Sequence, residues 1–236
     1  MKTKVLILVL TAILTLAAVS VVLADPIGPN SVDVRSTSKR TDFNTGSNQQ
    51  VAAEKGNISN LYVNTTAQTT HWQGYYGDVG GTITLDNANN WTMYSWVGDI
   101  VSPTGTVLAA TSAVTAWDSI TCINWTNITG LETWYGMGNS DSDGIDETFT
   151  GTKSLTIGSV SLTNCNATNL YMNDSSQTQT WNETILSLNN KTQPVIFAST
   201  IEDGKDSFIN GTKTDFQMVV GTKSTNMNYY FYIELN

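Results

Sequence analysis

The chain has 236 residues, of which 20 are acidic and 11 basic, and its formal net charge is −9. This balance excludes a nucleic-acid partner, because binding to a phosphate backbone depends on clustered lysines and arginines, and it disfavours acidic membrane surfaces for the same reason. Charged side chains make up only 13% of the chain, so Thr, Ser, Asn and Gln are expected to dominate a neutral, polar surface.

Residues 1–24 have the pattern of a secretory signal peptide. Lys2 and Lys4 precede a long apolar stretch, and small residues occupy the positions just before Asp25. The alternative is an uncleaved anchor helix, because about 20 apolar residues are enough to span a bilayer. Cleavage would leave a secreted chain without stable membrane insertion, and its net charge would be −11 because both lysines are lost.

Residues 25–54 form a polar N-terminal arm that contains both arginines of the chain. Within it, residues 31–37 alternate like a single strand, with two valines on one side. Two interpretations fit: a flexible linker, and a donor strand that pairs with a sheet in its own chain or in a neighbour. The residues assigned to subunit pairing are Val32, Val34, Arg35 and Arg40.

One sequence occurs twice, at residues 56–72 and 165–181. A match of this length predicts the internal duplication of one β-rich unit, with pseudo-repeats at about 55–163 and 164–236. The alternative is that both copies are strand–turn–strand signals in a chain rich in Thr and Asn. Without gaps, Asn57, Asn60, Leu61, Tyr62, Asn64, Gln68, Thr69 and Trp72 recur as Asn166, Asn169, Leu170, Tyr171, Asn173, Gln177, Thr178 and Trp181.

From residue 57 onward, β-rich runs alternate with turn signals such as Gly80-Gly81 and Asp203-Gly204. The only helical candidate is short, at residues 130–138. This pattern predicts an all-β fold, an antiparallel β-sandwich of jelly-roll or immunoglobulin-like type, over residues 55–236. The predicted strands lie at 58–63, 69–76, 80–86, 91–101, 105–110, 113–117, 120–128, 155–163, 167–172, 178–188, 194–202, 214–221 and 228–235.

The chain has two cysteines, Cys122 and Cys165. An even count in an oxidising compartment predicts one disulfide between them. The alternative is a pair of free buried thiols. A metal site built on the two cysteines is disfavoured, because no histidine partners lie nearby.

Residues 139–147, with the sequence NSDSDGIDE, resemble the first half of a calcium-binding loop. Oxygen ligands at alternate positions, with glycine at the sixth, let a tight turn wrap a hard cation. The twelfth position is Thr150 rather than Glu, which excludes a standard EF-hand. A solvated acidic loop and a structural calcium site both fit, and no other cofactor is expected. The candidate ligands are Asn139, Asp141, Asp143, Asp146 and Glu147.

Many asparagines begin an Asn-x-Ser/Thr sequon, which in a secreted chain is an acceptor for N-linked glycans on the surface. Some sequons arise by chance in a chain so rich in Asn and Thr, so we expect several, and not all, to be modified. They are Asn57, Asn64, Asn90, Asn124, Asn127, Asn166, Asn173, Asn182, Asn190 and Asn210.

Aromatic residues are frequent in the first half of the chain. On the face of a sandwich they could stack on sugar rings, but cores and subunit interfaces use the same residues. We expect core or interface positions for most of them. They are Trp72, Tyr75, Tyr76, Trp91, Tyr94, Trp96, Trp117, Trp125, Trp134 and Tyr135.

Catalytic motifs are missing from the sequence. The single histidine, His71, lies in a predicted strand, and no nucleophile elbow, zinc-protease motif, phosphate loop or dinucleotide fingerprint occurs. We therefore expect a protein that is not an enzyme.

Several blocks resemble a family of archaeal secreted β-sandwich surface proteins. They read HWQGYYG at 71–77, GTITLD at 81–86, SKR at 38–40, DFQMVV at 215–220 and YYFYIEL at 229–235. That family has no assigned catalytic residues, so the resemblance transfers none. The architecture also resembles the subunits of archaeal extracellular threads and bundling pili, in which the arm of one subunit completes the sandwich of the next.

The resemblance and the residues together imply a structural subunit at an archaeal cell surface. The expected partners are copies of the same chain and N-linked glycans, with the arm adding a strand to a neighbouring sheet. The alternative is a surface adhesin or a carbohydrate-binding module.

Overall fold

A computed structural model of the chain describes residues 24–40, 50–96, 104–225 and 227–235. The predicted signal peptide lies outside these residues except for Ala24. The strands are β1 (Trp72–Gly77), β2 (Ile83–Asp86), β3 (Thr92–Trp96), β4 (Gly105–Ala110), β5 (Ile120–Cys122), β6 (Gly151–Ile157), β7 (Val160–Met172), β8 (Ser176–Leu188), β9 (Val195–Thr200), β10 (Lys205–Asp206), β11 (Lys213–Thr214), β12 (Phe216–Gly221) and β13 (Tyr230–Leu235). The helices are η1 (Trp117–Ser119), α2 (Trp125–Tyr135) and α3 (Ile145–Thr148).

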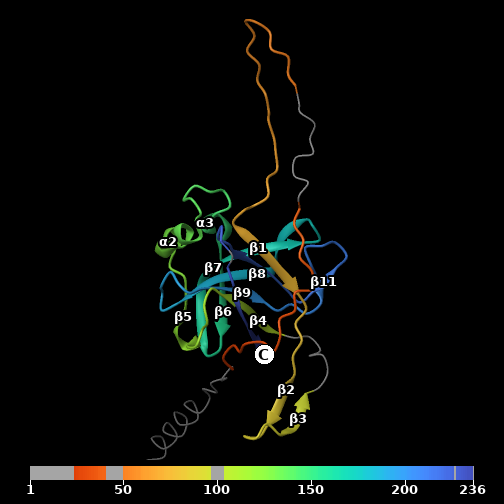
Figure 1. Ribbon diagram of the computed structural model, residues 1–236, viewed down its shortest axis with the longest axis vertical. Coiled ribbons are helices and arrows are strands. Elements are labelled where there is room, and N and C mark those ends of the chain that lie inside the picture. Colours follow the sequence, from red (N-terminus) through yellow and green to blue (C-terminus); the bar gives the residue numbers. More distant parts are fainter. Residues whose placement is uncertain (1–23, 41–49, 97–103, 226, 236) are drawn as a thin grey trace, which may run out of the picture.

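The described strands pair antiparallel throughout, which confirms the all-β prediction (Figure 1). The main sheet has seven strands in the order β13-β4-β9-β8-β7-β6, with β5 beside the second half of β8. Strands β1 and β12 form a second, two-stranded sheet. The central strands β4 and β9 are continuous apolar runs, GTVLAA and VIFAST, because both of their faces are buried.

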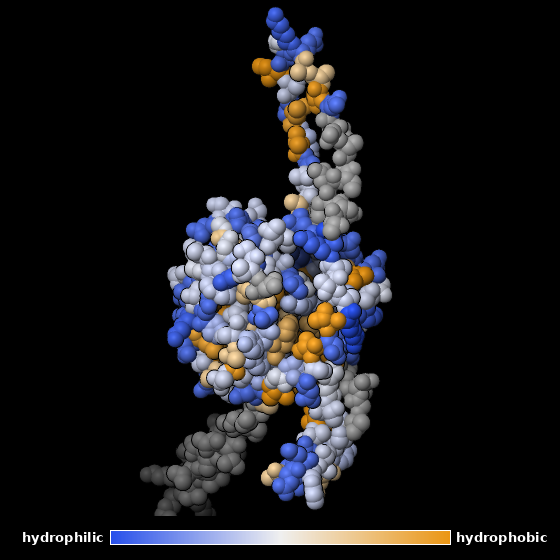
Figure 2. All heavy atoms as spheres, in the orientation of Figure 1, coloured by the Kyte–Doolittle hydropathy of each residue, from blue (hydrophilic) through white to orange (hydrophobic). Residues whose placement is uncertain are grey.

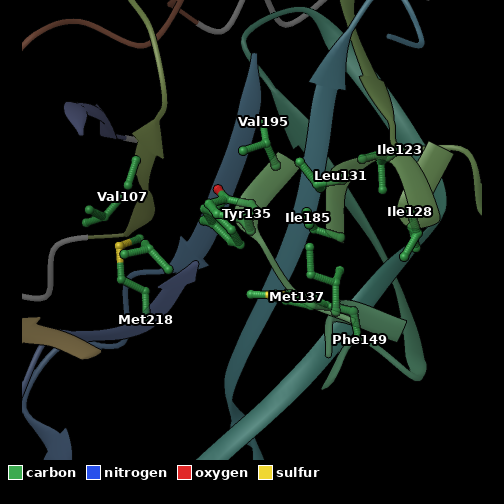
Figure 3. Close-up of a cluster of buried hydrophobic side chains, with 14 of the residues drawn as sticks. Val107, Ile123, Ile128, Leu131, Tyr135, Met137, Phe149, Ile185, Val195 and Met218 are labelled. Atoms are coloured by element: carbon green, nitrogen blue, oxygen red, sulfur yellow. The ribbon is translucent and has the colours of Figure 1, made fainter. Parts of the chain in front are cut away.

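The two faces of the main sheet carry separate hydrophobic clusters. On one face, Val107, Ile185 and Phe197 pack against α2 and against Met218 of β12 (Figure 3). On the other face, alternate residues of the same strands, such as Leu108, pack with the segment around η1 and with β6 and β7. The alternation of period two therefore distributes one apolar run between two layers.

The helix differs from its prediction. Residues 124–128 were expected to continue a strand, and a helix was expected only from residue 130. Instead α2 begins after Asn124, whose side chain accepts the N–H of Thr126, and ends at Gly136 with φ of 81°. An asparagine N-cap and a left-handed glycine are helix boundary signals, and they set the bounds.

The two copies of the repeated sequence have different structures. Residues 165–181 form most of β7 and the first part of β8, whereas residues 56–72 contain no strand before Trp72. The second copy pairs with β6 and folds back on itself as a hairpin between β7 and β8. The first copy instead extends from one end of the molecule, where its apolar side chains are exposed (Figures 1 and 2). The final tryptophans keep one shared role, since each indole N–H donates to a main-chain carbonyl.

A second projection, the β2–β3 hairpin, lies at the opposite end of the long axis (Figure 1). Its cross-strand pairs place Ile83 opposite Trp96 and Leu85 opposite Tyr94, so all four side chains share one face. Each is about half exposed. The hairpin is therefore amphipathic, with an apolar face that the described body leaves open to solvent.

Candidate functional site

The N-terminal arm meets the main sheet at its edge strand, β13. The N–H of Ile27 donates to the carbonyl of Ile233 at 2.9 Å, and the N–H of Ile233 donates back at 2.8 Å. Phe231 and Leu235 direct their main-chain groups to the same side of β13 as Ile233. Among the described residues no strand pairs with that side apart from the Ile27 bridge.

Proline explains why the bridge is so short. The register of the bridge places Pro29 opposite Phe231, and proline has no N–H to donate to a ladder. Pro26, on the other side of Ile27, is buried. The arm therefore pairs at one residue and then leaves the sheet.

The predicted donor strand is not a strand in the single chain. Residues 31–40 are exposed and carry no strand, and Val32 and Val34 are 58% and 77% exposed. The segment has no sheet partner here, so its alternation does not produce pairing. Arg35 instead forms an exposed ion pair of 2.6 Å with Asp78, a kind of contact that contributes little to stability.

The predicted calcium ligands fall into two groups rather than one. In the first group, Asp143 accepts the hydroxyl of Thr69 and lies 3.1 Å from Nδ1 of His71. These contacts, led by the hydroxyl, lower the pKa of Asp143. Asp141 lies on the other side of the ring, 3.8 Å from Nε2. The group thus fastens the end of the first repeat copy to the acidic loop.

This arrangement around His71 is not that of a nucleophile and its base. The Thr69 hydroxyl donates to the carboxylate of Asp143 and not to the imidazole. The ring is therefore not placed to remove the proton of that hydroxyl, as a base–nucleophile pair requires.

The second group contains a residue that the sequence did not single out. Ligand oxygens of Glu132, Asp146 and Glu147 lie within 4.8 Å of one another. Glu132 comes from α2, is 1% exposed, and accepts the N–H groups of Ile145 and Asp146 at 2.9 and 3.2 Å. Burial is the largest of the causes that raise the pKa of Glu132. No sequence signal links Glu132 to the loop, because only tertiary packing brings it there.

The three carboxyl groups meet over Gly144. A Cβ on this residue would lie 2.6 Å from Oε2 of Glu147, 2.9 Å from Oε1 of Glu132 and 3.1 Å from Oδ1 of Asp146. These oxygens match the ligand type that calcium prefers. Asn139 is exposed. A divalent cation would therefore be held by Glu132, Asp146 and Glu147 rather than by the whole predicted set.

A polar hollow of about 690 Å³ lies beside the acidic loop, over β6, β7 and β8. Its lining includes Lys153, Asn169 and Asn182, and none of its described lining residues is aromatic. Of the aromatics noted in the sequence, Trp117 and Tyr135 are buried in the two clusters, while Trp91 and Tyr94 are exposed on the β2–β3 hairpin.

The disulfide prediction is confirmed. Cys122 on β5 and Cys165 on β7 are bonded, with their Cα atoms 4.9 Å apart. The closed segment contains α2, the acidic loop, α3 and β6. The bond therefore ties both ends of the segment that holds the carboxylate cluster.

The sequons differ in how open their asparagines are. The partly buried ones include Asn127, Asn173 and Asn182, whose side-chain amides donate to neighbouring groups, and Asn166. Asn124 caps α2 through its Oδ1. The sequon asparagines that are exposed are Asn57, Asn64, Asn90, Asn124, Asn190 and Asn210.

Comparison of the chain with family models, with curated proteins and with solved structures finds no match. Within the described ranges, none of the helices has the length and apolar character needed to cross a membrane.

Proposed function

We propose that the protein is a secreted, N-glycosylated structural subunit of an extracellular filament or surface coat at an archaeal cell surface. The observation that carries the proposal is an exposed arm with strand alternation next to a sheet edge that is paired through Ile27 alone. Subunits would assemble by strand addition, with residues 31–37 of one copy on an open sheet edge of the next.

The register of the Ile27 bridge favours pairing between chains. Continued along β13, it places Asn30 opposite Tyr230, which is the first residue of that strand. Residues 31–37 therefore lie beyond the end of their own β13 and cannot pair with it in this register. Pairing with an open sheet edge of a neighbouring copy is not subject to that register, and a head-to-tail contact that does not close produces a filament.

Burial of the two valines supplies the driving force. Val32 and Val34 are mostly exposed in the single chain, and burying a valine contributes about 1.5 kcal/mol or more. Arg35 and its basic neighbours would meet a processed chain whose net charge is −11 once Lys2 and Lys4 are lost, so charge complementarity would assist the encounter.

Secretion and glycosylation rest on separate observations. A disulfide is typical of proteins from oxidising compartments, and several sequons are exposed. The proposal includes no catalytic activity.

The alternative is a surface adhesin or carbohydrate-binding module. The observation in its favour is the β2–β3 hairpin, where Trp91, Tyr94 and Trp96 are 74%, 58% and 55% exposed. Exposed aromatic rings can stack on sugars.

The test separates the arm from the rest of the chain. Deletion of residues 31–42, with Asp25–Asn30 kept, should give a folded protein that no longer forms fibres in electron micrographs. A peptide of residues 28–42 should then bind it and raise its melting temperature. Fibres of normal width from the truncated protein would show that other contacts hold the assembly.

The side chains are tested by charge placement. Val32→Asp with Val34→Asp in the peptide should prevent binding, because each carboxylate would be buried without a partner. Ser31→Asp with Thr37→Asp adds the same charge on the opposite face of the strand. This control peptide should still bind. Equal loss in both peptides would contradict strand addition by this face.

A further inference from the structure

The two edges of the main sheet meet on one side of the body. β13 and β6 stand at opposite ends of the strand order, yet the N–H of Gly158, just after β6, donates to Oε1 of Glu234 on β13 at 3.1 Å. Ile157 of β6 and Tyr232 of β13 also belong to one hydrophobic cluster. The sheet is therefore curled, and a seam lies between its edges.

The first residues of the expected mature chain lie in this seam. Ile27 pairs with β13, Pro26 is buried, and Asp25 contacts Gly158. Gly158 has φ of 55°, and a Cβ there would lie 3.5 Å from the Cα of Asp25 and in collision with its carboxylate. In Figure 1 this red segment lies beside the end marked C, as the bridge between Ile27 and Ile233 requires.

Glu234 brings an unpaired carboxylate oxygen to the seam. The residue is 2% exposed, and its Oε2 is buried without a hydrogen-bond partner. Burial first, and then the charge of Asp25, raise the pKa of Glu234. Among the described residues no Lys, Arg or His forms an ion pair with either carboxylate. An unpaired oxygen of this kind is costly to bury, so a cation placed in the seam would stabilise it.

We infer that Glu234 is the binding site for the chain's own N-terminal ammonium, which signal-peptide cleavage creates at Asp25. Hydrolysis of the Ala24–Asp25 peptide bond by a secretory peptidase consumes one water. The carbonyl carbon of Ala24 becomes a carboxylate, and the amide nitrogen of Asp25 becomes an ammonium. The neutral amide nitrogen of Asp25 is thereby replaced by a cation with three hydrogen-bond donors.

The inferred ion pair couples processing to the fold. The α-amino group has a pKa of about 7.7–8.0 in model peptides and is mostly protonated at neutral pH. It would offset the two carboxylates of Asp25 and Glu234 and hold Ile27 on β13. The precursor has no such cation, so the ion pair would form only after processing and would strengthen contacts that the uncleaved chain already makes. This inference rests on the processing step in the proposed function.

The experiment compares mature chains that differ by one residue. A chain that begins at Asp25 is prepared beside one with a single glycine before Asp25, which displaces the ammonium by about 3.5 Å. The added glycine should raise the unfolding equilibrium constant about tenfold to a hundredfold in urea, the range of a charge-assisted hydrogen bond. In the background of Glu234→Gln the glycine should have little effect. An equal effect of the glycine in both backgrounds would overturn the inference.

Amine reactivity gives a readout that does not depend on the stability of the variants. In the folded chain that begins at Asp25, the α-amine should react slowly with an acylating reagent at neutral pH, and Glu234→Gln should restore the rate of the unfolded chain. Equal rates in both proteins would overturn the inference. The N-terminus of the native protein is determined separately by mass spectrometry. A native chain that starts elsewhere would refute the processing step alone, since the prepared chains still test the site.

Discussion

Breaking the Cys122–Cys165 bond is expected to destabilise the protein by about 4 kcal/mol in the loop-entropy account of disulfides. The figure follows from the sequence separation of 43 residues between the two cysteines. It corresponds to a change of roughly a thousandfold in the unfolding equilibrium constant. For a chain of this length the melting temperature should fall by roughly 8–16 °C.

The assay is urea unfolding followed by tryptophan fluorescence, with and without a reductant. Reduction breaks the bond but keeps both sulfur atoms in place. Replacement of Cys165 by alanine also leaves a small cavity, because this side chain is fully buried. The double variant Cys122→Ala and Cys165→Ala should therefore be at least as unstable as the reduced protein, and reductant should not change it further. A loss below about 1 kcal/mol on reduction would refute the loop-entropy reasoning, because it would require an unfolded chain already constrained over this segment.

Three further predictions concern single positions. Burial raises the pKa of Glu183 well above 4.5, so the folded state binds more protons than the unfolded one. Stability should therefore fall as pH rises from the unfolded pKa through the folded one, and Glu183→Gln should flatten this profile in urea titrations that start at about pH 4 and proceed upward. Gly105→Ala should lower the free energy of unfolding by about 3 kcal/mol or more, because φ is 139° and the new Cβ would collide with the carbonyl of Glu234. As a control, Gly204→Ala, at a position with open space around it, should lower it by about 1 kcal/mol. If the carboxylate cluster of Glu132, Asp146 and Glu147 binds calcium, a chelator should lower the melting temperature, and Asp146→Asn should abolish that sensitivity. An unchanged melting curve with chelator would leave only an acidic loop.

Strands that are buried in the main sheet were predictable from the sequence. The run expected at residues 105–110 matches β4, and the runs at 194–202 and 228–235 contain β9 and β13. Apolar runs and alternation are local signals, and tertiary packing agrees with them here. The disulfide was equally predictable from the sequence, because two cysteines in an oxidising compartment can form only one pairing.

The contacts of the candidate site depended on tertiary structure instead. The sequence identified the arm through Val32 and Val34, but the pairing residue is Ile27, which prolines flank on both sides. Glu132 reaches the acidic loop from α2, a helix whose start the sequence analysis placed too far along the chain. Glu234 faces the opposite edge of its own sheet. Neither carboxylate stands in a motif, so only the packing of distant segments shows what each one contacts.

The described contacts of the arm fix it at its base and, further along, hold Arg35 by an exposed ion pair. At the base, Ile27 makes two main-chain hydrogen bonds, and the inferred ammonium would add a buried ion pair to Glu234. Further along, the described contact is the exposed pair of Arg35 with Asp78, which is easily exchanged for another partner. Fully extended, residues 28–37 would span roughly 33 Å, about twice the radius of gyration of roughly 16 Å expected for a body of this size. Processing would therefore set the point from which the arm leaves the body, and a neighbouring copy within that reach could take up the two valines without any change in the fold that presents them.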